Sequence, residues 1–299
     1  MHLVLTLIGP SDGDCLTHSL VDNARTALAR ASAEPGEVCW LAPGCAADIF
    51  CTGDDINRLE EAVRQSLGVV PVDIVLQPSA GRRKKLLVAD MDSTMITVEC
   101  IDELADVAGV GPHVAAITER AMRGEIDFEG ALRERVGLLQ GMHRKVLRQT
   151  FETRVNLTPG GRELVMTMRA AGAYTALVSG GFTYFTDRVS QLAGFQYNAA
   201  NRLVFVDDRL TGHVADPIVG ADMKRQTLRR LVAERGIAMA DSLAVGDGAN
   251  DLPMIKEAGL GVAFHAKPIV DAAAGARIRH GDLTALLYVQ GYSRNEILP

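Results

Sequence analysis

The sequence predicts an α/β protein whose main sheet is parallel and is preceded by a smaller α/β unit. Short apolar runs alternate with segments of helical spacing across residues 84–299, which is the pattern of strands and helices in an α/β fold. Three of these runs end directly in polar residues, as buried parallel strands do at the edge where ligands bind. Residues 1–80 contain an alternation of their own, and a polar connection separates them from the rest.

The composition is that of an ordinary globular protein. With 299 residues, of which 47% are hydrophobic, the chain is long enough for one large α/β domain and a small companion. Its net charge of −6 leaves no basic face of the kind that nucleic-acid binding requires, so we expect no nucleic-acid partner. No apolar run approaches the ~20 residues that span a bilayer, and residues 1–10 lack the basic start of a signal peptide. We therefore expect a cytoplasmic protein without a membrane partner.

The five cysteines form no recognisable metal or disulfide pattern. No two of them make a CxxC pair, and no histidine lies among Cys39, Cys45 and Cys51, which recur every six residues. We expect these three side chains to be small buried hydrophobic residues.

Residues 1–80 have the element order β-α-β-β-α-β. The apolar runs and helical spacings that give this order lie at residues 3–8, 16–28, 39–51, 56–67 and 72–76. A polar and basic connection follows at 78–85, with the composition of a linker. We therefore expect a small domain at 1–80 and a large domain at 84–299.

The large domain contains four apolar runs that we interpret as strands, at residues 86–89, 175–178, 243–245 and 260–264. The first three end in Asp90, in Ser179-Gly180-Gly181 and in Gly246-Asp247-Gly248. Between the first and second strands, a helical insertion at about 99–155 is long enough to cover the strand ends as a cap. A second insertion at 195–216 contains two strand-like runs around Asp207-Asp208 and predicts a hairpin.

Carboxylates gather at the strand ends. Asp90 and Asp92 follow the first strand, and Asp247 and Asp251 follow the third. Any one of them alone would be interpreted as a helix cap or a turn residue. Four converging carboxylates without a counter-charge would repel one another strongly, and a hard divalent cation removes that repulsion. The sequence therefore predicts a magnesium ion at these strand ends.

The same residue types indicate phosphoryl transfer. Asp90 is ionised at neutral pH and can attack phosphorus to give an aspartyl-phosphate. Asp92 is near enough to protonate the leaving oxygen and later to deprotonate the attacking water. The segment Ser179-Gly180-Gly181 can cradle a phosphate through its hydroxyl and N–H groups, and Lys224 can add a positive charge. By itself, Lys224 would be interpreted as a solvated surface lysine.

Four ordered motifs resemble those of the haloacid dehalogenase superfamily: DMDST at 90–94, SGG at 179–181, Lys224, and GDGAND at 246–251. The resemblance implies a Rossmann-like core with Asp90 as nucleophile and Asp92 as acid and base. It also implies a magnesium ion held by Asp90, the main-chain carbonyl of Asp92, and Asp247. Two further residues would support that metal shell, Asn250 and Asp251.

Within this superfamily, residues 84–299 resemble the phosphoserine phosphatases, which catalyse the last step of phosphorylated serine biosynthesis. The resemblance includes Glu99 after the first motif and three residues of the cap, Met122, Phe128 and Arg135. It implies O-phosphoserine as the substrate, with Arg135 suited to its carboxylate and Glu99 to its ammonium group. Met122 and Phe128 would line the cap and exclude water. The phosphate would contact Ser179, Gly180, Gly181, Lys224 and Asn250.

Residues 1–80 resemble, in element order only, the ACT-like regulatory regions that precede some of these enzymes, and this resemblance implies a serine effector. Two other functions stay open. One is a phosphotransferase, or a phosphatase for another small phosphate ester. The other is a non-enzymatic serine sensor, against which the intact Asp90, Asp92, Lys224 and Asp247 argue. The sequence does not fix the oligomeric state, and a homodimer stays open as well.

Overall fold

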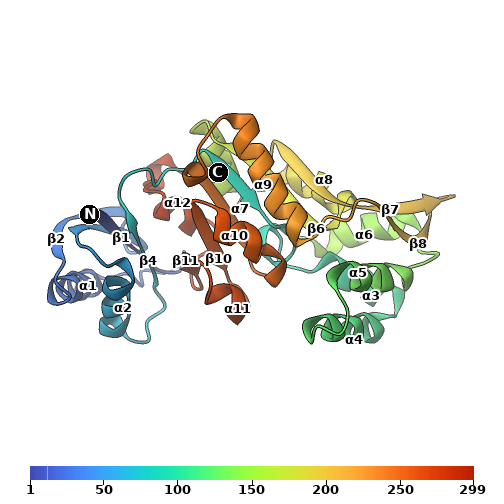
Figure 1. Cartoon of the computed structure of the whole chain (residues 1–299), viewed down its shortest axis with the longest axis horizontal. Coiled ribbons are helices and arrows are strands. Elements are labelled where there is room, and N and C mark those ends of the chain that lie inside the picture. Colours follow the sequence, from blue (N-terminus) through green and yellow to red (C-terminus); the bar gives the residue numbers. More distant parts are fainter. Residues whose placement is uncertain (12) are drawn as a thin grey trace.

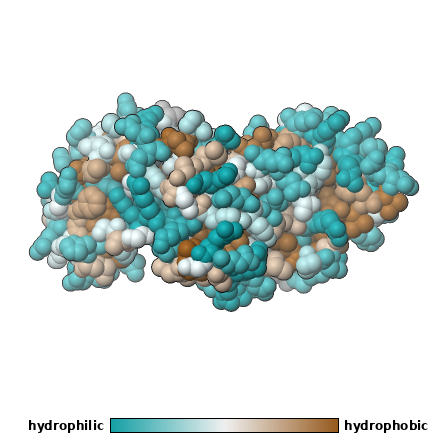
Figure 2. Space-filling model, turned by 90° about the horizontal axis from the view of Figure 1, so that it is seen from above, coloured by the Kyte–Doolittle hydropathy of each residue, from teal (hydrophilic) through white to brown (hydrophobic). Residues whose placement is uncertain are grey.

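The computed structural model describes residues 1–11 and 13–299, except for the side chain of Met122. Two sheets organise the chain, one of four strands in the N-terminal part and one of seven strands in the rest (Figure 1). Viewed from above, the surface is mostly hydrophilic, and hydrophobic residues appear in patches between hydrophilic ones (Figure 2). None of the described helices is long and apolar enough to cross a membrane.

The N-terminal sheet is antiparallel, with strand order β2-β3-β1-β4. Its unit comprises β1 (His2–Ile8), α1 (His18–Arg30), β2 (Glu34–Ala42), β3 (Ala46–Thr52), α2 (Ile56–Leu67) and β4 (Asp73–Pro78). The predicted order of elements is confirmed. Thr17 and Asp55 start the two helices, because their side chains accept hydrogen bonds from the backbone N–H groups of Leu20 and Arg58. We call residues 1–78 the N-terminal unit.

The two faces of this sheet bury different partners, because successive side chains of a strand point to opposite faces. On one face, Leu5 packs in a core cluster with Leu28 of α1 and Val63 of α2. On the other face, Ile8 and Val75 belong to the same core cluster as the residues of α12 (Ala285–Val289), close to the C-terminus. The N-terminal unit therefore shares a hydrophobic core with the large domain.

Buried polar contacts fix the N-terminal unit to the C-terminal segment. The carboxylate of Asp73 accepts hydrogen bonds of 2.8–3.2 Å from the backbone N–H groups of residues 279–281. Gln77 Nε2 donates to the carbonyl oxygen of Val289 at 2.7 Å. Asp73 and Gln77 both lie on β4 and are buried, so water does not compete for these contacts.

The seven-stranded sheet has the order β11-β10-β9-β5-β6-β7-β8 and is parallel except for the antiparallel pair β7–β8. Its strands are β5 (Leu86–Ala89), β6 (Tyr174–Phe182), β7 (Tyr197–Val206), β8 (Arg209–Ala215), β9 (Ser242–Gly246), β10 (Leu260–Phe264) and β11 (Ala276–Ile278). The predicted parallel strands and the predicted hairpin are confirmed. The sequence does not predict β11, which has only three residues.

Helices cover both faces of this sheet. Leu87 and Ala89 of β5 belong to the core cluster that includes α7 (Gly161–Ala170), α8 (Thr183–Ala193) and α12. Leu86 and Val88 point the other way, into the cluster with α9 (Ala221–Arg235), α10 (Leu252–Glu257) and α11 (Pro268–Asp271). Both faces of β5 are thus buried, as expected for the middle strand of a doubly covered parallel sheet. Short helical turns lie at Met91–Met95, Met239–Asp241, Ala249–Asp251 and Arg294–Glu296.

Four helices fill the insertion expected to form a cap: α3 (Cys100–Ala108), α4 (Gly111–Met122), α5 (Phe128–Gly137) and α6 (Arg144–Arg154). In Figure 1, α3, α4 and α5 form a green layer to one side of the seven-stranded sheet. The β7–β8 hairpin is joined to the cap, because Gly141 N donates to Leu210 O and Leu210 N donates to Met142 O, both at 2.8 Å.

One expectation about the cysteines is wrong. Cys45 and Cys51 are buried, but Cys39 is exposed. Its neighbour Val38 packs against the helices of the N-terminal unit, so the alternation of the strand turns Cys39 to the opposite face. Because β2 is the edge strand, the C-terminal segment does not cover that position.

Candidate active site

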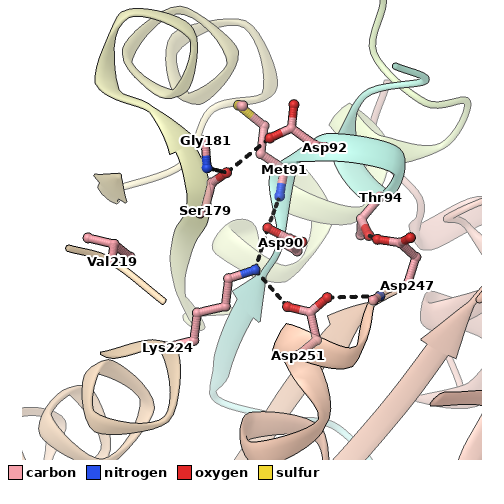
Figure 3. Close-up of polar contacts among 12 residues, drawn as sticks. Asp90, Met91, Asp92, Thr94, Ser179, Gly181, Val219, Lys224, Asp247 and Asp251 are labelled. Carbon is pink, nitrogen blue, oxygen red and sulfur yellow. Dashed lines mark hydrogen bonds and ion pairs between the residues drawn. The ribbon is translucent and has the colours of Figure 1, made fainter. Parts of the chain in front are cut away.

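Three adjacent strands bring the expected catalytic residues to one edge of the sheet. Asp90 directly follows β5, Asp247 directly follows β9, and Ser179 lies near the end of β6. Since β5 pairs in parallel with both β6 and β9, the three carboxyl ends lie side by side (Figure 3). The topology, rather than proximity in the sequence, assembles this site.

Lys224 is the central cation of the site. Its Nζ lies 2.6 Å from Asp90 Oδ1 and 2.7 Å from Asp251 Oδ1, and its side chain is fully buried (Figure 3). Burial alone would lower the pKa of Lys224, but the carboxylates of Asp251 and Asp90 raise it above its ordinary value. The lysine is therefore charged and holds both carboxylates in place, which excludes the interpretation as a solvated surface residue.

Asp92 faces the second strand end rather than Lys224. Its Oδ1 accepts a hydrogen bond from Cys100 N at 2.9 Å, and Ser179 Oγ donates to its Oδ2 at 3.2 Å. Gly181 N in turn donates to Ser179 Oγ at 2.8 Å. Burial, with the charges of Glu99 and Asp90, raises the pKa of Asp92 to about 7. This carboxyl group can therefore exchange a proton near neutral pH.

Asp90, Asp247 and Asp251 form a buried acidic cluster that can hold a divalent cation. One carboxylate oxygen of each lies within 4.8 Å of the others. These three carboxylates face the single cation of Lys224. Burial, with the charges of Asp90 and Glu99, raises the pKa of Asp247 to about 6. Both Asp251 oxygens already accept hydrogen bonds, from Lys224 and from Gly248 N, which suits a supporting role. The side chain of Asp92 points away from this acidic cluster, toward Cys100 N and Ser179 Oγ. Its main-chain carbonyl is therefore the atom that we expect to bind the cation.

A cavity of about 880 Å³ lies between the strand ends and the cap. From the core it is lined by Asp90, Asp92, Ser179, Gly180, Gly181, Asp247 and Asn250. From the cap side, Glu99, Phe128 and Arg135 line it. Ser93 Oγ donates to Glu99 Oε1 at 2.7 Å, and Arg135 donates from Nε to Ala131 O at 3.2 Å. Met122 lies in α4, but its expected side-chain contact falls outside the described part of the chain.

The cap touches the core at Phe128. An added Cβ on Gly180 would lie 3.0 Å from Phe128 Cζ, and one on Gly220 would lie 3.1 Å from Phe128 Cδ1. The absence of side chains at these two positions therefore lets the aromatic ring rest directly on the backbone beside the cavity. This contact joins the cap to the core at the edge of the cavity.

The family model of the haloacid dehalogenase-like hydrolases matches residues 87–256. The chain belongs to this family. The matched region contains all three strand ends described above, at Asp90, Ser179 and Asp247, and it also contains Lys224.

Relatives of this hydrolase include proteins named phosphoserine phosphatase. That of Haemophilus influenzae is 51% identical over 202 residues, which cover 68% of this chain and 64% of the relative. That of Streptomyces coelicolor is 39% identical over 290 residues, which cover 94% of this chain and 70% of the relative.

Solved structures also resemble this hydrolase. The unliganded form of a probable phosphoserine phosphatase from Vibrio cholerae has a TM-score of 0.78 and 34% identity, and the match covers 99% of this chain and 88% of that one. A phospho-aspartyl intermediate analogue of phosphoserine phosphatase has a TM-score of 0.64 and 39% identity, covering 69% and 98%.

Among the residues at the site of this hydrolase that are absent from the sequence prediction, two make hydrogen bonds that support it. Lys267 lines the cavity, and its backbone N–H donates to Asp247 O at 3.0 Å. Because it follows the fourth predicted strand, the strand-end pattern could have identified it. Asn201 is buried and donates from Nδ2 to Gly180 O at 2.8 Å, while its Oδ1 accepts from Val219 N at 2.7 Å. It lies within β7, where no local pattern marks it.

Proposed function

We propose that the chain is a magnesium-dependent phosphatase that hydrolyses O-phosphoserine to serine and phosphate through an aspartyl-phosphate at Asp90. The proposal rests mainly on two carboxyl groups, those of Asp90 and Asp92, which line the same cavity but have different neighbours. Asp90 pairs with Lys224 Nζ at 2.6 Å, whereas burial raises the pKa of Asp92 to about 7. Relatives named phosphoserine phosphatase and the solved phospho-aspartyl analogue support the same chemistry.

In the first step, a carboxylate oxygen of Asp90 attacks phosphorus, and the bond between phosphorus and the serine oxygen breaks. Asp92 donates its proton to that oxygen. In the second step, the Asp92 carboxylate takes a proton from water as the water oxygen attacks phosphorus, and phosphate leaves Asp90. Ser179 Oγ and Gly181 N, which donate here to Asp92 Oδ2 and Ser179 Oγ, would donate to the phosphoryl oxygens when the substrate is bound. A magnesium ion on Asp90, Asp247 and the Asp92 carbonyl would supply further positive charge there.

The cap supports the choice of phosphoserine over other esters. Besides phosphate, this substrate carries an ammonium and a carboxylate group. Glu99 and Arg135 line the same cavity and carry the complementary charges. Burial lowers the pKa of Arg135, but an arginine side chain does not lose its proton in proteins, so the guanidinium is positive.

The nucleophile is tested with Asp90→Asn. The amide keeps an oxygen that can accept a hydrogen bond from Lys224 but cannot attack as an anion, so we expect the fold to persist and turnover to be abolished. Brief reaction with ³²P-labelled phosphoserine followed by acid quenching should trap label on the wild-type protein and none on the variant. Near-normal turnover by Asp90→Asn would exclude Asp90 as nucleophile.

The metal is tested by chelation and by Asp247→Asn. Exhaustive EDTA treatment should abolish phosphoserine hydrolysis, and magnesium should restore it. Magnesium should also raise the thermal midpoint of the wild-type protein, because an ion that binds only the folded state stabilises it. The shift should be much smaller in Asp247→Asn. Full activity after verified metal removal would contradict the proposal.

We further infer that the N-terminal unit carries a regulatory serine site. Asp73 binds Gly281 N, and the carbonyl oxygen of Gly281 lies 2.9 Å from His265 Nε2. His265 is two residues before Lys267, which lines the cavity. These contacts give a contiguous route between the unit and the catalytic site.

Serine inhibition tests this inference. Calorimetry should detect two serine sites per chain, one for the product in the cavity and one in the N-terminal unit. The inhibition should contain a noncompetitive component, which Asp73→Ala weakens while the competitive component persists. Purely competitive inhibition with a single site would contradict it.

A further inference from the structure

A second cavity, of about 630 Å³, lies outside the catalytic site and shares no lining residue with it. We call it the basic pocket. It is formed by the first turns of α6 and α8 and by the β7–β8 hairpin, so it joins the cap to the core. Five of its lining residues are cationic: Arg144, Lys145, Arg148, Arg188 and Arg202.

The positive charge of the basic pocket is only partly compensated, and Arg148 pairs with Glu152 at 3.9 Å. The two carboxylates of the pocket belong to Asp187 and Asp208, and Asp208 forms an ion pair of 3.3 Å with Arg144. Within the described part of the chain, Lys145, Arg188 and Arg202 have no carboxylate within ion-pair distance. A chain with a net charge of −6 thus gathers surplus cations in one concavity.

Two of the guanidinium groups are held in fixed planes by aromatic rings. Arg188 Cζ lies 3.7 Å from the centre of the Tyr184 ring, and its Nη1 donates to Tyr184 O at 2.7 Å. Arg144 Cζ lies 4.0 Å from the centre of the Phe205 ring. Stacking restricts a long side chain before any ligand arrives, so less entropy is lost when its free N–H groups bind an anion.

We propose that the basic pocket binds a small polyanion with at least two phosphoryl or carboxylate groups. Fixed guanidinium planes match such groups bidentately, and the pocket has the volume of an ordinary small-molecule site. The negative charge of the whole chain disfavours a long nucleic acid. The ligand would bridge Lys145 of the cap to Arg188 and Arg202 of the core.

Calorimetry with tripolyphosphate in metal-free buffer tests the proposal. Without a divalent ion, a polyphosphate in the catalytic cavity would face Asp90, Asp92 and Asp247, and the variants below assign the binding to the basic pocket. Arg188→Gln/Arg202→Gln should weaken binding by about tenfold or more, the equivalent of losing one charge-assisted contact. Lys145→Gln/Arg202→Gln removes no stacked residue and should weaken binding as well. The matched control Arg162→Gln/Arg235→Gln removes the same charge elsewhere, including an arginine stacked on Tyr174, and should bind as the wild type does.

Further experiments distinguish phosphoryl ligands from other polyanions. Citrate that competes with tripolyphosphate would assign the pocket to polyanions in general, whereas its failure would restrict it to phosphoryl groups. Bound probe should slow hydrogen exchange in residues 143–148 and 183–188. The proposal is overturned by equal affinity in the pocket and control variants, by no binding at millimolar probe, or by much tighter binding of a single-stranded oligonucleotide than of tripolyphosphate.

Discussion

At the scale of single residues, the proposed choice of phosphoserine depends on Arg135 and Glu99, which line the cavity from the cap side. Arg135→Ala should remove charge-assisted hydrogen bonds to the substrate carboxylate that contribute about 1.5–3 kcal/mol. We expect a loss of roughly ten- to hundredfold in kcat/KM for phosphoserine. Glu99→Gln should weaken the ammonium contact similarly. Hydrolysis of an aryl phosphate, which has neither group, should change little in both variants.

The measured quantity is the ratio of kcat/KM for phosphoserine to that for the aryl phosphate, so that losses of folded protein cancel. Arg133→Ala is the matched control, because Arg133 lies on the same helix but pairs with Glu129 and Asp216 outside the cavity. Unchanged ratios in both Arg135→Ala and Glu99→Gln would remove the physical basis for phosphoserine as the substrate.

At the level of elements, the sequence predicts where the strands end. It does not predict the hydrogen bonds between residues far apart in the chain that hold those strand ends in place. The apolar run before Asp90 indicates a buried strand, and parallel topology then places its end beside those of the other strands. Asn201 holds Gly180 from a hairpin strand 21 residues away, and no local periodicity encodes that pairing. The same limit applies to Asp73, whose partners at 279–281 lie more than 200 residues further along the chain.

The contact between α5 and the end of β6 gives a prediction at this scale. Gly180→Ala would place a methyl group 3.0 Å from Phe128 Cζ and should push the cap away from the core. We expect about a tenfold loss in kcat/KM for phosphoserine, since a small misplacement of the cap separates Arg135 from the substrate. The control is Gly137→Ala in α5, the helix of Phe128. Its added methyl group would meet nothing within 4 Å, so kcat/KM should change little.

A double-mutant cycle identifies the cause of this loss. In the Phe128→Ala background the added methyl group has room, so Gly180→Ala should then cost little further activity. An equally large loss in both backgrounds would show that the substitution acts through the phosphate-binding backbone and not through the cap.

For the whole molecule, the junction between the two sheets should contribute substantially to stability. Asp73→Ala leaves the N–H groups of residues 279–281, of which that of Gly281 is buried, without their acceptor, which should lower the free energy of unfolding by about 2–3 kcal/mol. Urea denaturation measures this change, and the fully exposed Asp54→Ala serves as control. The wild type should unfold in a single urea transition, without a separate transition for the N-terminal unit. An Asp73→Ala variant as stable as the control would contradict this assignment.

The shared core also sets an order of events during synthesis. Ile8 and Val75, on the second face of the N-terminal sheet, belong to a core cluster that includes residues 285–289. The ribosome makes these about 210 residues after β4, which at typical elongation rates takes roughly 10 to 40 s. Throughout that interval the nascent sheet can cover one face with α1 and α2, while the other stays open to water or to a chaperone. Its final closure is therefore timed by translation of the C-terminal segment.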